Sequence, residues 1–472
     1  MTFVLFVNAL ILCAAGGLML VEGLLFPLTR GPFLEAGMLA LCAGLLTGLC
    51  ASPRLEAMRP LHTFLLTASV WLTAGLAGAL PLWLWGMSFT DAVFEAISGI
   101  TTTGSTVMTG LDDTPQGILF WRAQLQWFGG VGFIVTGMAL LPVMRVGGMQ
   151  LFRTESSERG ENELTTATRF ASATLWVYCS LTAVCAMVYA LGGMTAFEAV
   201  VHAMTTLSTG GFSTSDSSFG QFASPWLQWS GTLFMLAGGL PFAWYIHIAR
   251  GGSPWSEQVT ALLRTLAFVI GGLTLWRMIS GEVGLEPALR EVAFNVVSVV
   301  TTTGFATTDY LTWGAFAATA FFVLTAMGGC TGSTSGGGKM MRWILLSRSI
   351  SAEIARIHQP HRIDRIRYEG RAVGQDRIDG VISFMGFFFL TFALLSVALT
   401  LLGLDIATAT SGALTALANV GPGVGSIIGP AGTFAPLPDG AKWLLAVGMY
   451  VGRLEMLTVF VLLTPVFWRE AT

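Results

Sequence analysis

The sequence predicts an all-α polytopic membrane protein, and its composition and the length of its apolar runs are the observations that predict this class. Of its 472 residues, 53% are hydrophobic and 11% are charged, and the mean hydropathy is +0.70. Several apolar runs are longer than the roughly 20 residues that a helix needs to cross a bilayer. The net charge of −3 provides no basic surface for nucleic acid. We therefore expect a helical bundle surrounded by a lipid bilayer, with no nucleic-acid partner.

Ten candidate spans follow one another along the chain. Their approximate ranges are 3–26, 34–51, 62–87, 117–144, 170–193, 226–249, 258–280, 313–346, 380–403 and 442–468. If the spans alternate in direction, the connections rich in arginine all lie on one side, and segment 342–377 alone holds eight arginines. Positive charge marks the cytoplasmic side, so an even number of spans leaves both termini in the cytoplasm. Segment 342–377 either fixes this topology through its charge or is a docking surface for a cytoplasmic partner.

Four clusters of small and polar residues recur at corresponding places between these spans. They are Ile-Thr-Thr-Thr-Gly-Ser (100–105), Leu-Ser-Thr-Gly-Gly-Phe (207–212), Val-Thr-Thr-Thr-Gly-Phe (300–305) and Ala-Asn-Val-Gly-Pro-Gly (418–423). Each follows an apolar segment that is too short to cross, and each precedes a long span that is rich in glycine. Internal repeats around a shared axis place a site at mid-depth in a membrane. The repeating unit is therefore a span, a half-helix, a filter-like loop and a second span.

The predicted architecture is four pseudo-symmetric helix–pore-loop–helix repeats around a central pore, plus two N-terminal helices. We expect a two-helix extension at 1–61, followed by repeat 1 at 62–160, repeat 2 at 161–255, repeat 3 at 256–372 and repeat 4 at 373–472. In this architecture the four clusters meet near the axis.

The residue types in the clusters suit a filter for monovalent cations. Irregular backbone at membrane depth is tolerated only where it lines water or is packed in protein. Inward carbonyl oxygens can replace the water shell of an ion, and glycine reaches the required backbone angles without steric cost. Each half-helix would also aim the negative end of its dipole at its loop. Aligning the clusters predicts the filter residues Thr103, Gly104, Thr209, Gly210, Thr303, Gly304, Val420 and Gly421.

The threonine hydroxyls and the nearby acids each have two interpretations. The hydroxyls either act as additional oxygen ligands or form bonds that hold the loops. The acids near the predicted outer mouth either concentrate cations or are ordinary solvated loop charges. These acids are Asp112, Asp113, Asp216 and Asp309.

The clusters also carry a resemblance to a known family. The matching stretches are 101–106, 147–158, 202–213, 297–308 and 419–425. In these stretches the chain resembles the Trk/Ktr/HKT superfamily of potassium transporters, and within it the bacterial TrkH-type subunits. The resemblance implies a homodimer in the bacterial inner (cytoplasmic) membrane that takes up K+ through a gated, channel-like pore. It also implies K+ in the pore, no cofactor in this chain, and a cytoplasmic TrkA-type nucleotide-binding regulatory subunit.

The same resemblance indicates a gate in repeat 3. Segment 327–340 (MGGCTGSTSGGGKM) is similar to the family's intramembrane loop below the filter, and each glycine disfavours a helix by about 1 kcal/mol relative to alanine. Arg453, in the last span, matches the family's arginine that acts as an electrostatic barrier. The predicted gate residues are Gly328, Gly329, Gly332, Gly336, Gly337, Gly338, Lys339 and Arg453. A packed helix break and a buried structural ion pair remain alternatives.

Two further residues have specific expectations. Glu455 lies two positions after Arg453, and because side chains at i and i+2 do not share a helix face, we do not expect these two to pair. His202 lies in the second half-helix and is expected to pack behind the filter rather than to carry protons.

Other functions make different demands on the sequence. The alternative to a channel-like pore is a sodium- or proton-coupled secondary cation transporter, which needs a coupling carboxylate at mid-membrane, and we expect none in the half-helices. The chain is not expected to be an enzyme, because it lacks a catalytic constellation such as paired aspartates or HExxH. It also lacks a Walker or Rossmann fingerprint, so nucleotide sensing would lie in the partner.

Overall fold

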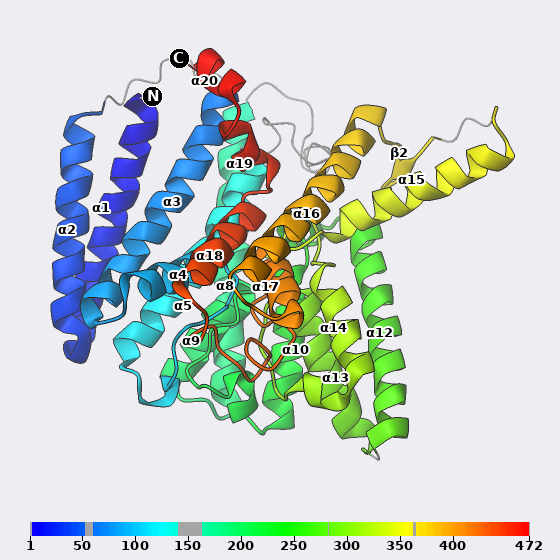
Figure 1. Ribbon diagram of the computed structural model, residues 1–472, viewed down its shortest axis with the longest axis horizontal. Coiled ribbons are helices and arrows are strands. Elements are labelled where there is room, and N and C mark those ends of the chain that lie inside the picture. Colours follow the sequence, from blue (N-terminus) through cyan, green and yellow to red (C-terminus); the bar gives the residue numbers. More distant parts are fainter. Residues whose placement is uncertain (1, 52–59, 140–162, 282, 362–364, 472) are drawn as a thin grey trace.

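A computed structural model gives the fold of the protein (Figure 1). The structure describes residues 2–51, 60–139, 163–281, 283–361 and 365–471. The α-helices are α1 (Thr2–Leu25), α2 (Arg30–Leu49), α3 (Pro60–Trp85), α4 (Phe89–Ile100), α5 (Gln116–Ala139), α8 (Glu163–Leu191), α9 (Ala196–Leu207), α10 (Pro225–Gly239), α11 (Phe242–Ala249), α12 (Glu257–Gly281), α13 (Leu285–Val300), α14 (Ala315–Thr325), α15 (Met340–His358), α16 (Gln375–Leu401), α17 (Ile406–Ala418), α18 (Asp439–Arg453), α19 (Leu457–Leu462) and α20 (Pro465–Ala471). Short 3-10 helices are η1 (Pro27–Thr29), η2 (Leu111–Asp113), η3 (Ser218–Gln221) and η4 (Tyr310–Trp313).

The fold is that of an all-α protein with several membrane spans, as predicted. Six of the described helices are long and apolar enough to cross a bilayer, namely α1, α2, α3, α8, α12 and α16. Their outer faces carry large exposed apolar side chains, such as Phe268 of α12, which is 83% exposed. Such a surface is stable in a bilayer, because its apolar side chains contact lipid tails rather than water. The described strands, β1 (Arg367–Tyr368) and β2 (Arg371–Ala372), form one short antiparallel hairpin.

Three of the ten predicted spans are interrupted, which corrects the prediction of continuous helices. The span predicted at 226–249 is the pair α10 and α11, which meet at an angle of 92°. Pro241 lies at this break, and proline cannot continue a helix because it lacks an N–H and clashes with the preceding turn. The N–H of Phe242 instead donates to the carbonyl of Gly332, at 2.9 Å.

The other two interruptions have different causes. The span predicted at 313–346 consists of α14 and α15, joined by the irregular segment 326–339. The span predicted at 442–468 consists of α18, α19 and α20, and Glu455 in its first break has a φ of 58°. The predicted span 117–144 begins as α5, and its last residues, like motif 147–158, lie outside the described residues.

Four short helices, α4, α9, α13 and α17, correspond to the predicted half-helices. Ser88, Thr195 and Asp405 cap three of them, each accepting a hydrogen bond from a backbone N–H of the first turn. Such caps satisfy N–H groups that have no partner within the helix. The nearby hydroxyl of Thr408 and its amide, which donates a hydrogen bond at 3.1 Å, lower the pKa of the exposed Asp405 carboxyl because both favour its charged form. The helix starts are thus fixed by side chains that the sequence supplies locally.

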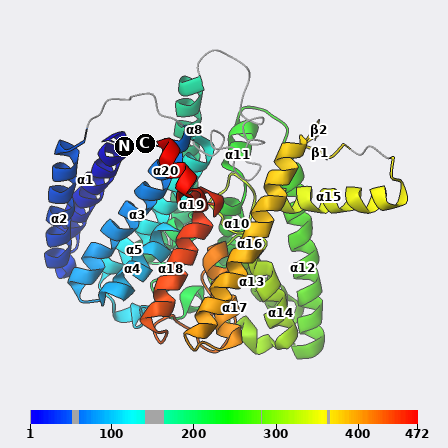
Figure 2. The same ribbon diagram turned by 45° about the horizontal axis from the view of Figure 1, so that its top comes forward.

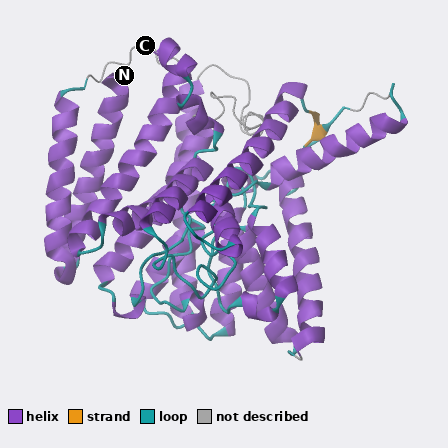
Figure 3. Cartoon of the chain, in the orientation of Figure 1, coloured by secondary structure: helices purple, strands orange, loops and turns teal. Residues whose placement is uncertain are grey.

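Glycines of the long helices allow the half-helices to approach closely. A Cβ on Gly129, Gly238 or Gly452 would press against the carbonyl oxygen of Ile100, Leu207 or Leu417 respectively. Each of these carbonyls belongs to the last turn of a half-helix. Small residues at helix interfaces permit such contacts in membrane proteins. The packing therefore brings the ends of the half-helices, and the loops that follow them, into the middle of the bundle (Figure 3).

The remaining elements lie around this centre. The pair α1 and α2 lies at one edge of the molecule, and α15 extends away from the bundle at the opposite edge (Figures 1 and 2). The division of the chain at residues 61, 160, 255 and 372 stays a prediction.

Candidate functional site

Four loops leave the ends of the half-helices with the same backbone hydrogen bonds. In each loop, one N–H donates to the carbonyl five residues earlier. These pairs are Thr103 to Ser98 at 2.9 Å, Gly210 to Thr205 at 2.9 Å, Thr303 to Ser298 at 2.8 Å and Val420 to Thr415 at 3.1 Å. The residues just before these donors have positive φ, namely Thr102 at 55°, Thr209 at 51°, Thr302 at 59° and Asn419 at 55°. The residues just after them are glycines with positive φ, namely Gly104 at 84°, Gly211 at 76°, Gly304 at 83° and Gly421 at 108°.

The second loop corrects the register that the sequence alignment assumed. Gly211, rather than Gly210, occupies the position of Gly104, and Gly210 occupies the position of Thr103. Thr209 accordingly corresponds to Thr102. Two consecutive glycines allow either alignment in sequence, and the backbone hydrogen bonds decide between them.

The four loops contact one another in a closed cycle. A Cβ on Gly104 would collide with the carbonyl oxygen of the second loop, and a Cβ on Gly211, Gly304 or Gly421 would meet that of the third, fourth or first loop in turn. The carbonyls concerned are those of Gly210, Thr303, Val420 and Thr103. Only glycine permits this approach together with a positive φ. The cycle closes because the fourth loop touches the first, so the loops surround a common axis.

The threonine hydroxyls of the loops form bonds that hold the backbone. The hydroxyl oxygens of Thr101 and Thr103 are 2.7 Å apart, and those of Thr301 and Thr303 are 2.9 Å apart. Asn419 of the fourth loop donates to the hydroxyl of Thr103 at 2.9 Å. This hydroxyl therefore connects the first loop to the fourth.

A cavity of about 70 Å³ lies where the chain leaves the four loops, and Gly104, Gly211, Gly304 and Gly421 all line it. Of the four acids expected near the mouth, Asp216 also lines this cavity. Its carboxylate accepts hydrogen bonds from the N–H groups of Gly110 at 2.8 Å and Leu111 at 3.1 Å. Asp216 thus holds the first loop's continuation against the second loop.

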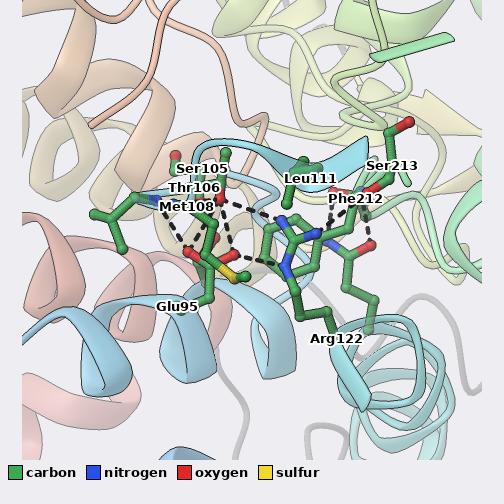
Figure 4. Close-up of polar contacts among 12 residues, drawn as sticks. Glu95, Ser105, Thr106, Met108, Leu111, Arg122, Phe212 and Ser213 are labelled. Atoms are coloured by element: carbon green, nitrogen blue, oxygen red, sulfur yellow. Dashed lines mark hydrogen bonds and ion pairs between the residues drawn. The ribbon is translucent and has the colours of Figure 1, made fainter. Parts of the chain in front are cut away.

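Side chains at equivalent positions of the first three half-helices contact the chain segments that follow the filter loops. Glu95 accepts from the N–H of Val107 at 2.9 Å (Figure 4). In the next two half-helices, His202 Nε2 lies 3.1 Å from Ser213 Oγ, and the Asn295 amide donates to Thr307 Oγ1 at 3.0 Å. The fourth loop is held by Ser411, which donates to the carbonyl of Val424 at 2.7 Å.

His202 packs behind the filter, as expected. It is fully buried, and its ring contacts those of Phe219, Phe222 and Phe305. Its Nδ1 lies 2.9 Å from the carbonyl oxygen of Glu198, so protein groups engage both ring nitrogens.

Glu95 is a buried carboxylate in the first half-helix, so the expectation that the half-helices lack a coupling carboxylate depends on what holds its side chain. It lies in α4, is fully buried, and pairs with Arg122 of α5, with Nε and Oε1 2.8 Å apart. The sequence shows Glu95 but does not indicate its partner, which is 27 positions away. A buried charge of this kind is stable only when it is paired and hydrogen-bonded.

Segment 326–339 lies against the ends of the half-helices, where the chain enters the four loops. Thr334 Oγ1 lies 3.0 Å from the carbonyl oxygens of both Leu207 and Gly238, which share its single hydroxyl hydrogen. Ser335 Oγ donates to the carbonyl of Thr301 at 2.7 Å. A Cβ on Gly336 would collide with the carbonyl of Ala418. The segment therefore touches α9, α13 and α17 at the ends nearest the axis.

The predicted gate residues all lie in or against this segment. Gly328, Gly332 and Gly337 have φ values of 80°, 83° and 71°, and Lys339 has one of 59°. The other three predicted glycines pack tightly, since a Cβ on Gly329, Gly336 or Gly338 would approach neighbouring atoms too closely.

Arg453 joins the segment to α5. Its guanidinium donates to the carbonyl of Thr334 at 2.9 Å and to that of Gly129 at 3.3 Å. Glu455 pairs instead with Arg342 and with Lys339, whose Nζ is 3.9 Å from Oε1. The expectation that Arg453 and Glu455 do not pair with each other is therefore confirmed.

Gln126 is a further residue of this site, and no sequence pattern pointed to it. Its side-chain amide donates to the carbonyl of Gly210 at 2.6 Å and accepts from the N–H of Phe212 at 3.0 Å. It lies one turn after Arg122 on the same face of α5, so both side chains reach the second loop.

Comparisons with known proteins agree with this geometry. The TrkH family of cation transport proteins matches residues 31–271 and 277–468. A Trk system potassium uptake protein TrkI from Halomonas elongata is 51% identical over 419 residues, which cover 88% of this chain and 85% of that protein. The Trk system potassium uptake protein TrkG of Escherichia coli is 30% identical over 430 residues, which cover 88% and 86% of the two chains.

The fold also matches a solved structure. The crystal structure of the potassium transporter TrkH from Vibrio parahaemolyticus aligns with a TM-score of 0.91 and 32% identity over 99% of each chain. These proteins are transporters rather than enzymes. The chain belongs to the TrkH family of cation transport proteins.

Proposed function

We propose that this protein takes up K+ through a gated, channel-like pore whose selectivity filter is formed by the four loops. The closed cycle of glycine–carbonyl contacts carries this proposal, because it brings four irregular backbone segments to one axis. Backbone oxygens that surround an axis can replace the hydration shell of a monovalent cation. The relatives TrkI and TrkG are potassium uptake proteins by name, which supports K+ as the ion.

The half-helices add a favourable electrostatic field. Each of α4, α9, α13 and α17 ends at a filter loop. The C-terminal end of a helix carries the equivalent of about half a negative charge. Four such ends stabilise a cation between them and disfavour an anion.

We assign the gate to segment 326–339 together with Arg453. The segment lies against the entering side of the filter loops, and Arg453 places a positive charge on the same side. Side-chain and backbone hydrogen bonds hold it there, and each is worth about 1 kcal/mol. Binding of a partner can supply a free energy of this size, so the segment can move aside.

The partners and the location follow the family expectation. The protein would be a homodimer of the bacterial inner membrane with both termini in the cytoplasm. Its relatives are named as parts of Trk systems, which supports a partner subunit, and we assign this role to a cytoplasmic TrkA-type nucleotide-binding subunit. The arginine-rich segment 342–377 is the docking surface, where Arg348 and Arg356 have exposed fractions of 40% and 46%.

The alternative, a sodium- or proton-coupled secondary transporter, needs a carboxylate that is free to bind and release the coupling ion. In the first half-helix, Glu95 is a buried carboxylate beside the filter loops, but it is engaged by Arg122, by the hydroxyl of Thr106 and by the N–H of Val107. These contacts favour the channel-like pore.

Growth of a potassium-uptake-deficient bacterium at low potassium tests the proposal. Expression of the protein should restore growth, and Gly104→Ser and Gly304→Ser should reduce the rescue, because each adds a side chain between two filter loops. Gly271→Ser is the matched control, since a Cβ there meets no atom within 4 Å. Unchanged rescue by both filter variants would refute the filter assignment.

A further inference from the structure

The ion pair between Glu95 and Arg122 lies directly behind the first two filter loops (Figure 4). The two side chains have exposed fractions of 0% and 1%. Glu95 also accepts hydrogen bonds from the hydroxyl of Thr106, at 2.9 Å to Oε1, and from the N–H of Val107, at 2.9 Å to Oε2. The carboxylate of Glu95 therefore holds the first loop by a backbone N–H, that of Val107, and by a side-chain hydroxyl, that of Thr106.

Arg122 connects this carboxylate to the second loop. One of its terminal nitrogens donates to the carbonyl of Ser213 at 3.2 Å, and the other donates to Thr106 Oγ1 at 3.2 Å. Its guanidinium carbon also lies 4.1 Å from the centre of the Phe212 ring. Thr106 and Ser213 are each two residues beyond the filter glycine of their loop, Gly104 and Gly211, so Arg122 links corresponding points of the two loops.

The bonds at two other joints between loops are neutral. Between the second and third loops, the N–H of Gly220 donates to the carbonyl of Ala306 at 3.0 Å. Between the fourth and first loops, Ser105 Oγ donates to the carbonyl of Gly421 at 2.9 Å. The position of Glu95 is taken by His202 in the second half-helix and by Asn295 in the third. A charged connection is thus a feature of the joint between the first and second loops.

We propose that Glu95 and Arg122 are positioning residues that fix the spacing of the first and second filter loops and thereby determine ion selectivity. A guanidinium presents its donors in a rigid planar fork, so partners on two loops are held at fixed separations. The separation of the loops decides how well their oxygens match K+ rather than the smaller Na+. This inference rests on the proposed function.

A purely electrostatic role would have a different consequence. Arg122 lines the cavity beside the filter, and the charge of Glu95 neutralises it. If charge alone mattered, Glu95→Gln would lower the flux of every cation, Arg122→Gln would raise it, and the double variant would resemble the wild type. A positioning role instead predicts loss of selectivity in all three.

The test is the ratio of K+ to Na+ permeability, measured from reversal potentials of the purified protein in planar bilayers. We expect Glu95→Gln, Arg122→Gln and the double variant to lower this ratio about tenfold, a size typical of coupled buried pairs. Matched controls are Arg277→Gln and Glu291→Gln, which break a pair of 2.5 Å between α12 and the half-helix α13, outside the four loops. The controls should change the ratio by less than about twofold.

Arg122→Lys decides the matter if the neutral variants do not assemble. It keeps the charge but lacks the fork, so the ratio should still fall, with protein that elutes normally from a size-exclusion column. A wild-type ratio in Arg122→Lys, or in the assembled neutral variants, would overturn the inference. A wild-type protein that does not prefer K+ would refute the proposed function instead.

Discussion

At each filter glycine, the hydrogen that stands in place of a side chain faces a carbonyl of the neighbouring loop. The sequence identifies these glycines because threonine and glycine recur at matching places in the chain. It does not fix the register of the second loop, since Gly210 and Gly211 are chemically identical. The N–H of Gly210, which bonds the carbonyl of Thr205, and the positive φ of Gly211 decide this register.

Alanine substitutions test the register of the second loop. Gly211→Ala should abolish most K+ uptake, because alanine at positive φ costs about 1–2 kcal/mol and its Cβ would collide with the carbonyl of Thr303. Gly210→Ala should be milder, because the three atoms nearest its Cβ all belong to the side-chain amide of Gln126, which can shift more easily than a backbone carbonyl. Initial rates of rubidium uptake into cells, normalised to the amount of protein, measure the difference. A greater loss in Gly210→Ala would support the register taken from the sequence.

The sequence predicts the half-helices and the continuous spans, but it does not predict the breaks within the interrupted spans. Ser88, Thr195 and Asp405 are local signals for the start of a half-helix. The break at Pro241 is also marked by its residue type, but the surrounding apolar run resembles a span. The break after Arg453 depends on Glu455 reaching Arg342 and Lys339 of a distant segment, which periodicity does not reveal.

Removing the bonds that hold segment 326–339 should open the pore. Thr334→Val and Ser335→Ala each delete hydroxyl bonds to the half-helix ends, and a loss of about 1 kcal/mol changes a two-state ratio about fivefold. Each variant should therefore raise the K+ flux of the protein without its partner, measured in liposomes. Ser333→Ala is the control, because its hydroxyl bonds Cys330 within the segment. Fluxes equal to that of the wild type would argue against this segment as the gate.

For the molecule as a whole, composition and apolar length suffice to predict a multi-pass membrane protein, and the recurring clusters predict that four loops meet. The connections between the loops are not predictable from periodicity. Glu95, Arg122 and Gln126 act across elements, and nothing in their local sequence indicates their partners. Such contacts form only when distant elements pack together, and the spacing of residues along the chain does not reveal which of them meet.

A channel-like pore also determines what should drive transport. In liposomes with an imposed membrane potential, K+ influx should follow the potential and should persist without Na+ and without a pH gradient. The reason is that Glu95, a buried carboxylate of the first half-helix, is held by Arg122 and does not exchange a coupling ion. Influx that requires Na+, or that stops when only the pH gradient is removed, would favour the coupled transporter.

The claim that the four loops bind K+ on a common axis is tested by anomalous diffraction from crystals grown with Rb+ in place of K+. We expect a peak on the axis enclosed by Thr103–Gly104, Gly210–Gly211, Thr303–Gly304 and Val420–Gly421. Rubidium bound elsewhere in the protein, with no density inside this ring, would contradict it.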